Sequence, residues 1–176
     1  MFPEKKVWIA GNFDIPVSEI LAQIIETKQT NKEHIMVVEC SSFMLYQLQD
    51  FSFDYSILLN IARDHLDWHK DWDEYRDSKL NLLKFTKKCG ICPLELMEHL
   101  SHETRNHTKK LPLEYDLSET QFLGKHNQSN LAAVRLLTEN YVVDSHLDLA
   151  MYQEKFTEVV KTVSPLDHRL KLLTEK

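Results

Sequence analysis

Glycine and cysteine are scarce in this chain of 176 residues, and each shortage excludes a class of protein. The only glycines are Gly11, Gly90 and Gly124, and no GxxxxGK[ST] motif occurs, so the chain carries no phosphate-binding loop. The three cysteines, an odd number at low density, argue against a disulfide scaffold. No apolar run approaches the roughly 18 residues of a membrane span, and the amino terminus lacks the apolar segment of a signal peptide. We therefore expect a cytoplasmic protein with no membrane partner.

Clusters of basic residues are also lacking. Asp and Glu number 27 against 21 Lys and Arg, which gives a formal charge of -6. No basic stripe is present for a nucleic-acid backbone, so nucleic acid is not an expected partner. With 43% hydrophobic residues, the length suits one compact domain with a real core, and we expect a monomer.

What the sequence does contain is an alternation of apolar strands and amphipathic helices. Strands are predicted at residues 7–10, 35–38 and 56–61. Helices are predicted at 126–141 and after Ser18, Asp71 and Ser145, with these three residues as their caps. Residues 93–103 suit a short helix, and 106–110 suit a loop. The alternation predicts an α/β fold of three layers, with a mostly parallel sheet flanked by helices.

Polar residues follow each of the three predicted strands. Because the carboxyl ends of parallel strands share one edge of a sheet, Asn12, Glu39, Ser41 and the Asp64-His65 pair should converge there. Carboxylate and imidazole groups are ligands for magnesium, manganese or zinc. A divalent metal site and a solvated, charged turn both remain open at this point.

Lys79 stands out in the helix that follows Asp71. It shares one stripe with Trp72, Tyr75, Leu82 and Leu83, and so lies on the face that turns inward. An ammonium group in that position must extend to solvent, pair with a carboxylate or lose its charge. These three alternatives stay open on the residues alone.

Three further patterns allow more than one interpretation. Cys89 and Cys92 have the spacing of a metal or redox pair, but the context favours small core residues. Asn127 and Asn130 share the stripe of the 126–141 helix, where either a capping or a binding role is open. A metal-dependent hydrolase built on Asp64, His65, Asp67 and His69 is an alternative function that needs no nucleotide.

Five motifs occur in order along the chain and carry a resemblance. They are ECSSF at 39–43, LLNIARDHLD at 58–67, YRDSKL at 75–80, GKHNQSN at 124–130 and DHR at 167–169. The series resembles the central, ATP-binding domain of the Mur ligases, and it is most similar to the branch that adds D-glutamate to UDP-N-acetylmuramoyl-L-alanine. The resemblance covers nearly the whole chain.

This resemblance implies a function in peptidoglycan precursor synthesis. In the family, ATP phosphorylates the substrate carboxylate, and the amine of D-glutamate attacks the acyl phosphate. The central domain has a P-loop-type fold and binds ATP with two Mg²⁺ ions. The resemblance therefore implies ATP and Mg²⁺ as cofactors, and UDP-N-acetylmuramoyl-L-alanine and D-glutamate as substrates.

The motifs also imply roles for single residues. Glu39 resembles a ligand of the Mg²⁺ between the nucleotide phosphates, His65 resembles a ligand of the second Mg²⁺, and Lys79 matches a lysine that the family carbamylates. These three are the expected catalytic and metal-binding residues. Asn127 and Asn130 match residues that meet the adenine, and Arg169 matches one near the phosphates. Asn12 and Ser41 match positions around the muramoyl substrate.

The chain also departs from the family pattern. The phosphate loop that precedes Gly11 in the family is absent, Asp14 replaces a glycine, and Leu166-Asp167 replaces Leu-Pro. We therefore expect a ligase segment truncated at both ends, with the central domain at 1–164, the start of a carboxyl-terminal domain at 165–176, and little activity alone. A non-catalytic remnant that only binds a partner is a third possible function.

Overall fold

The computed structural model describes residues 5–12 and 15–164. The chain divides into two compact units, Met1–Leu48 and Gln49–Lys176, where the sequence predicts one compact domain. The domain limits expected at 164 and 165 stay a prediction, because the residues beyond 164 lie outside the described part. No helix of the described residues is both long and apolar enough to cross a membrane.

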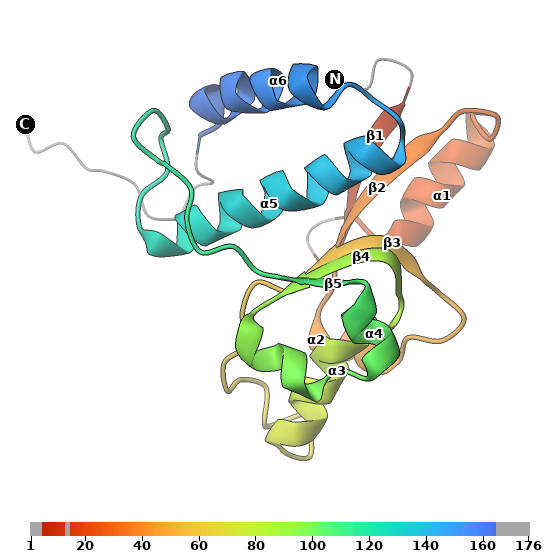
Figure 1. Ribbon diagram of the computed structural model, residues 1–176. Helices are drawn as coiled ribbons and strands as arrows, with labels where there is room; N and C mark the ends of the chain where they lie inside the picture. Colours follow the sequence, from red (N-terminus) through yellow and green to blue (C-terminus); the bar gives the residue numbers. More distant parts are fainter. Residues whose placement is uncertain (1–4, 13–14, 165–176) are drawn as a thin grey trace, which may run out of the picture. The chain divides into compact units, whose positions relative to one another are not determined.

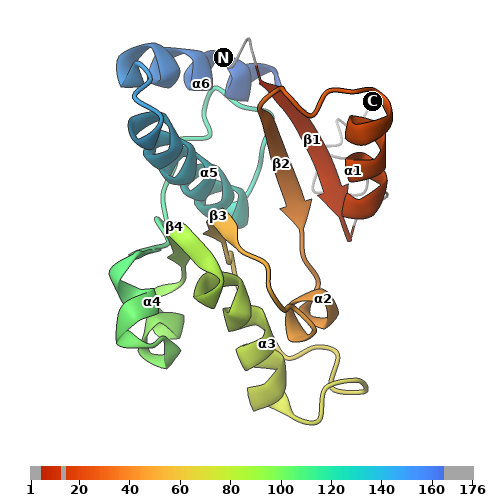
Figure 2. The same ribbon diagram turned by 90° about the vertical axis from the view of Figure 1, so that its right-hand side faces the viewer.

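The first unit is a two-stranded parallel sheet with one long helix against it. Its elements are β1 (Lys6–Gly11), α1 (Val17–Glu26), β2 (His34–Glu39) and α2 (Ser42–Tyr46). The strands pair in register from Lys6 opposite His34 to Gly11 opposite Glu39. Ile20 and Ile24 of α1 pack on Ala10, and this packing holds α1 beside the sheet (Figure 2).

The second unit is a three-layer α/β structure. Its elements are β3 (Phe53–Ile57), α3 (Trp72–Lys84), β4 (Thr86–Cys92), the 3-10 helix η1 (Leu94–His99), α4 (His102–Asn106), β5 (Thr108–Lys110), α5 (Lys125–Asp144) and α6 (Leu149–Thr162). The strands form a parallel sheet in the order β3-β4-β5. Helices α3 and α5 lie on opposite sides of this sheet (Figure 1). The observed sheets confirm the predicted α/β class with parallel strands flanked by helices.

The two cysteines of β4 belong to different layers of the core. Cys92 packs with Leu80 and Leu83 on the α3 side, whereas Cys89 packs with Ala133 on the α5 side. Residues three apart in a strand point to opposite faces, so the two thiols cannot share a metal ion or a disulfide. Their role as small core residues follows from this geometry.

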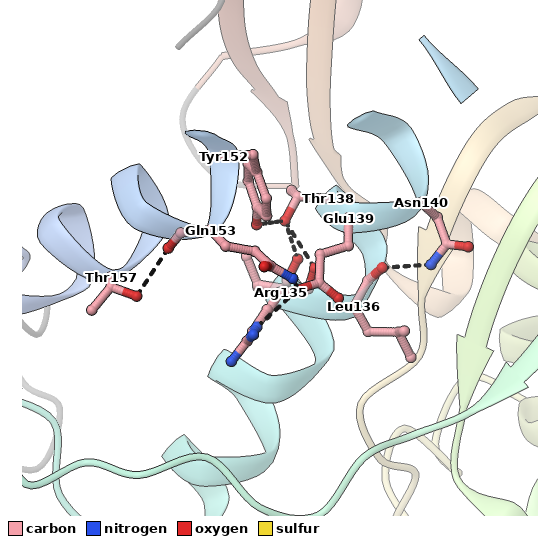
Figure 3. Close-up of polar contacts among 9 residues, drawn as sticks. Arg135, Leu136, Thr138, Glu139, Asn140, Tyr152, Gln153 and Thr157 are labelled. Atoms are coloured by element: carbon pink, nitrogen blue, oxygen red, sulfur yellow. Dashed lines mark hydrogen bonds and ion pairs between the residues drawn. The ribbon is translucent and has the colours of Figure 1, made fainter. Parts of the chain in front are cut away.

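Polar contacts join α5 to α6 (Figure 3). The hydroxyls of Thr138 and Tyr152 are hydrogen-bonded, and Gln153 donates to the Glu139 carboxylate at 3.0 Å. Glu139 also accepts from Arg135 at 3.0 Å. These bonds fix α6 along the outer side of α5.

Several predicted boundaries are wrong. The third strand runs over Phe53–Ile57 and not over 56–61, because beyond Ile57 only the Leu58 N–H still reaches β4, donating to the Ile91 carbonyl at 2.8 Å. Residues 108–110, predicted as loop, form β5, since pairing with β4 outweighs their polar character.

Two predicted caps are also wrong. Pro16 precedes α1, so Ser18 lies inside that helix. Asp148 caps α6 by accepting from the Met151 N–H at 3.0 Å, whereas Ser145 ends α5.

The sequence predicts that all three strands end at one edge of one sheet. Among the described residues, β1-β2 and β3-β4-β5 are separate sheets, so no single sheet forms that edge. Convergence of all three strand ends stays a prediction.

Candidate functional site

In the first unit, the predicted residues meet where β1 and β2 end. Gly11 has φ 114°, and a Cβ at this position would lie 2.2 Å from the Glu39 carbonyl oxygen, so glycine is required there. The same carbonyl accepts from the Asn12 N–H at 2.8 Å, and the Glu39 side chain is exposed. Ser41 caps α2 by accepting from the Met44 N–H at 3.3 Å. Asn12, Glu39 and Ser41 therefore lie at the same end of this sheet.

In the second unit, a tight turn presents His65 after β3. His65 has φ 55°, which is uncommon for a residue other than glycine. The Asp64 carboxylate accepts from the His65 N–H at 2.8 Å, and the His65 carbonyl accepts from Trp68 and His69. Backbone strain of this kind persists only where the surroundings hold it, and it concentrates at functional sites.

The turn places His65 against α3. The ring centroids of His65 and Tyr75 are 6.2 Å apart. Burial raises the pKa of Tyr75, and the nearby Asp64 carboxylate raises it further. Lys79 is four residues after Tyr75 and so lies one turn along the same helix face. His65 thus packs on α3 one helical turn before the position of Lys79.

The surroundings of Lys79 fit the prediction of an inward stripe only in part. Tyr75, Ser78, Leu80 and Leu83 are buried, whereas Trp72, Lys79 and Leu82 are half-buried. Lys79 takes no part in the ion pairs between described residues, and the carboxylates of Asp73 and Asp77 on the same helix bind Arg76. Lys79 is therefore a half-buried lysine at the border of the core face.

The described residues fit Mg²⁺ in part. Mg²⁺ is commonly bound by one or two carboxylates together with phosphate oxygens and water, and the exposed Glu39 carboxylate suits that role. His65 offers a ring nitrogen, and Lys79 could serve only after its ammonium group becomes an anion. Among the described residues, no three His, Cys, Asp or Glu side chains form a group that could hold a metal by themselves.

That finding also bears on the hydrolase alternative. Asp64, His65 and Asp67 are exposed, while His69 is buried with its Nδ1 3.6 Å from the Glu74 carboxylate. The four side chains of that alternative therefore do not gather into one metal-binding group in the described part of the chain.

A cavity of about 440 Å³ opens beyond the carboxyl ends of β3, β4 and β5. Its polar lining consists of Asn60, Glu95, Lys110, His126, Ser129 and Asn130. Its apolar lining consists of Leu59, Pro93, Leu94, Leu111 and Leu113. A cavity of this size, with an apolar wall and a few polar groups at the ends of parallel strands, is typical of small-molecule sites.

The two asparagines predicted to meet the adenine lie in different surroundings. Asn130 lines the cavity, but Asn127 does not, because its amide donates to the Leu123 carbonyl at 2.8 Å and ties the loop to the start of α5. Arg169 lies outside the described residues.

Most of the cavity lining carries no recognisable signal in the sequence. Glu95 and Lys110 lie in the stretch between 89 and 123, where periodicity is weak, and Lys110 reaches the cavity only because β5 pairs with β4. Asn60 could have been predicted as a site residue from the sequence, since a polar residue directly after a buried strand is a recognisable signal.

Residues 7–117 match the family model of the Mur ligase middle domain. The chain is 24% identical to the UDP-N-acetylmuramoylalanine--D-glutamate ligase of Natranaerobius thermophilus, over 96% of the chain and 40% of the relative. It is 31% identical to the enzyme of the same name from Lawsonia intracellularis, over 93% of the chain and 35% of the relative. The chain thus spans well under half the length of these relatives. Because the family model matches more than half of it, the chain belongs to the Mur ligase family, through the middle domain.

Proposed function

We propose that this chain holds the nucleotide base and the metal-facing residues of an ATP-dependent ligase of peptidoglycan precursor synthesis. The observation that carries the proposal is the cavity beyond β3, β4 and β5, with Asn60 and Asn130 in its wall. The family membership and the names of the relatives support the same function.

The lining suits a purine. Leu59, Leu94 and Leu113 are exposed apolar side chains on the cavity wall, and they offer a surface for a flat ring. Side-chain amides present both donors and acceptors, as the edge of adenine requires. The cationic Lys110 can attract the charged part of a nucleotide.

The metal-facing residues divide between the two units. Glu39 would hold one Mg²⁺, and His65 with Lys79 would hold a second. Bound Mg²⁺ would supply positive charge to offset that of the transferred phosphoryl group. Carbamylation of the half-buried Lys79 would replace its positive charge with an anion.

The names of the relatives support a choice of substrates for the complete reaction. The carboxylate of UDP-N-acetylmuramoyl-L-alanine accepts the terminal phosphoryl group of ATP, and the amine of D-glutamate then displaces phosphate to form the amide. Asn12 and Ser41 are assigned to the muramoyl substrate. In this proposal the reaction takes place in the cytoplasm and the protein is a monomer.

Calorimetry with the purified chain tests the nucleotide site. ATP with Mg²⁺ should bind, and Asn130→Leu should weaken binding about tenfold or more, because a buried amide contact is lost. Asn106→Ala, an exposed change in α4, is the matched control and should bind like the parent chain. Absence of heat at millimolar ATP would instead favour a non-catalytic remnant.

A further inference from the structure

His69 has a buried, ionisable side chain, and the proposed function gives it no role. Its side chain has 0% exposure, in a turn whose other residues from Ala62 to Lys70 are exposed. Burial of a histidine is costly unless its polar ring is used, so the position calls for a reason.

The contacts of His69 join the turn to α3. Its ring packs edge-on against Trp68, with centroids 4.6 Å apart, and against Tyr75 of α3, with centroids 5.3 Å apart. Its Nδ1 lies 3.6 Å from the Glu74 carboxylate. Its backbone N–H donates to the His65 carbonyl at 3.0 Å.

The same Glu74 carboxylate holds the end of the turn. It accepts from the Lys70 N–H at 2.9 Å, and the Glu74 N–H in turn donates to the Asp71 cap at 2.9 Å. His69 is therefore bound through its backbone to His65 and through its ring to Tyr75, the residue on which the His65 ring also packs.

From these contacts we infer that His69 is a positioning residue: its buried ring anchors the 64–70 turn on α3 and thereby holds His65 over Tyr75, one helical turn from Lys79. This inference rests on the proposed function for its catalytic meaning, but the positioning itself is a property of the chain without metal or nucleotide.

The test uses nuclear magnetic resonance of the purified 176-residue chain, with the His65 ring signals assigned through His65→Gln. Packing on Tyr75 should displace these signals, and Tyr75→Leu defines the undisplaced position. His69→Ala should lose the displacement and should speed amide exchange in the turn about tenfold. His69→Phe, which keeps a ring between Trp68 and Tyr75, should retain the displacement. His102→Ala, at an exposed histidine of α4, is the control and should change neither.

The inference is overturned if the His65 signals stay displaced in His69→Ala, even when its melting temperature falls, because His69 would then only stabilise the fold. If His69→Ala does not fold, His69→Phe decides, and loss of the displacement in that variant also overturns the inference. Mn²⁺ serves as a separate probe. If it fails to broaden the His65 signals of the parent chain, the proposed metal site is wrong. The positioning role of His69 is tested separately, by the displacement of the His65 signals.

Discussion

At the scale of single residues, the chemistry of the site depends on groups held at the border of the core. Lys79 is half-buried and His65 is exposed in a strained turn, so both reach solvent while their backbones are fixed by α3 and by Asp64. Such placement lets both side chains meet a ligand without a large rearrangement.

The first prediction concerns Lys79 in an active Mur ligase that carries this segment as its middle domain. Lys79→Ala should lower ligation at least about a hundredfold while the fold stays intact, because alanine suits a helix and only the metal-facing anion is lost. Acetate should restore part of the activity, since it supplies the same charge in the vacated space.

Lys79→Arg is the informative comparison in the same assay. It should stay inactive with acetate present, because the guanidinium keeps its positive charge beside a cation. Activity in the arginine variant, with the alanine variant unfolded, would identify Lys79 as an ordinary ion-pairing residue.

A second prediction concerns the pH dependence that Cys92 causes. Burial, with a smaller contribution from Glu95, raises the pKa of this thiol to about 11. The unfolded thiol ionises nearer its ordinary value of 9.0, so the folded state keeps a proton that the unfolded state loses. The contribution of Cys92 to the free energy of unfolding is therefore fully present below about pH 9. It falls by up to about 1.4 kcal/mol per pH unit as the pH rises towards 11.

Urea unfolding at several pH values between 8 and 11 measures this effect as the difference between the parent chain and Cys92→Ala. That difference in free energy of unfolding should shrink as the pH rises. If the free energy of unfolding changes equally with pH in the two proteins, then the pKa of the Cys92 thiol does not differ between the folded and unfolded states.

At the scale of elements, the side chains of Asp71 and Glu74 fix the start of α3. Asp71 accepts from the Glu74 N–H, while Glu74 reaches back to the Lys70 N–H, one residue before the usual capping-box partner. The structure confirms the predicted Asp71 cap. This start sets the rotation of α3 and therefore the direction of Tyr75 and Lys79.

The third prediction is that Asp71→Ala lowers the free energy of unfolding by about 1 kcal/mol, because the first turn of α3 loses an acceptor. Asp148→Ala, which removes the equivalent cap of α6, should cost a similar amount and is the matched control. Hydrogen exchange should accelerate in the first turn of α3 only in the Asp71 variant. Acceleration there in both variants would mean that the cap acts through global stability.

At the scale of the whole molecule, both compact units contain residues with proposed functional roles. Asn12, Glu39 and Ser41 come from Met1–Leu48, whereas His65, Lys79 and the cavity come from Gln49–Lys176. Phosphoryl transfer needs metal ligands and donors to the β- and γ-phosphates of the nucleotide.

The fourth prediction is that the 176-residue chain alone produces no measurable ADP from ATP with UDP-N-acetylmuramoyl-L-alanine and D-glutamate. The sequence contains no GxxxxGK[ST] loop, and loss of the groups that hold the transferred phosphoryl costs several kcal/mol of transition-state stabilisation. A coupled ADP assay checks this, with ATP binding by calorimetry as the control for a folded chain. Robust turnover by the pure chain would contradict it.

Local patterns in the sequence were sufficient for the fold class and for the Asp71 cap. Strand and helix periodicity depends on which residues are apolar, and a cap depends on neighbours three residues away, so both are written in short stretches of chain. The motif series was likewise sufficient to identify the family, because each motif is read without knowing where it lies in space.

The cavity lining and the burial of His69 were decided by the tertiary structure alone. Lys110 faces the cavity because β5 pairs with β4, and His69 is buried because the turn folds back on Tyr75. Both depend on contacts between segments that a periodicity of 2 or 3.6 residues does not encode. The same holds for Cys89 and Cys92, whose spacing allowed a shared metal until the alternation of side chains along β4 placed them on opposite faces of the sheet.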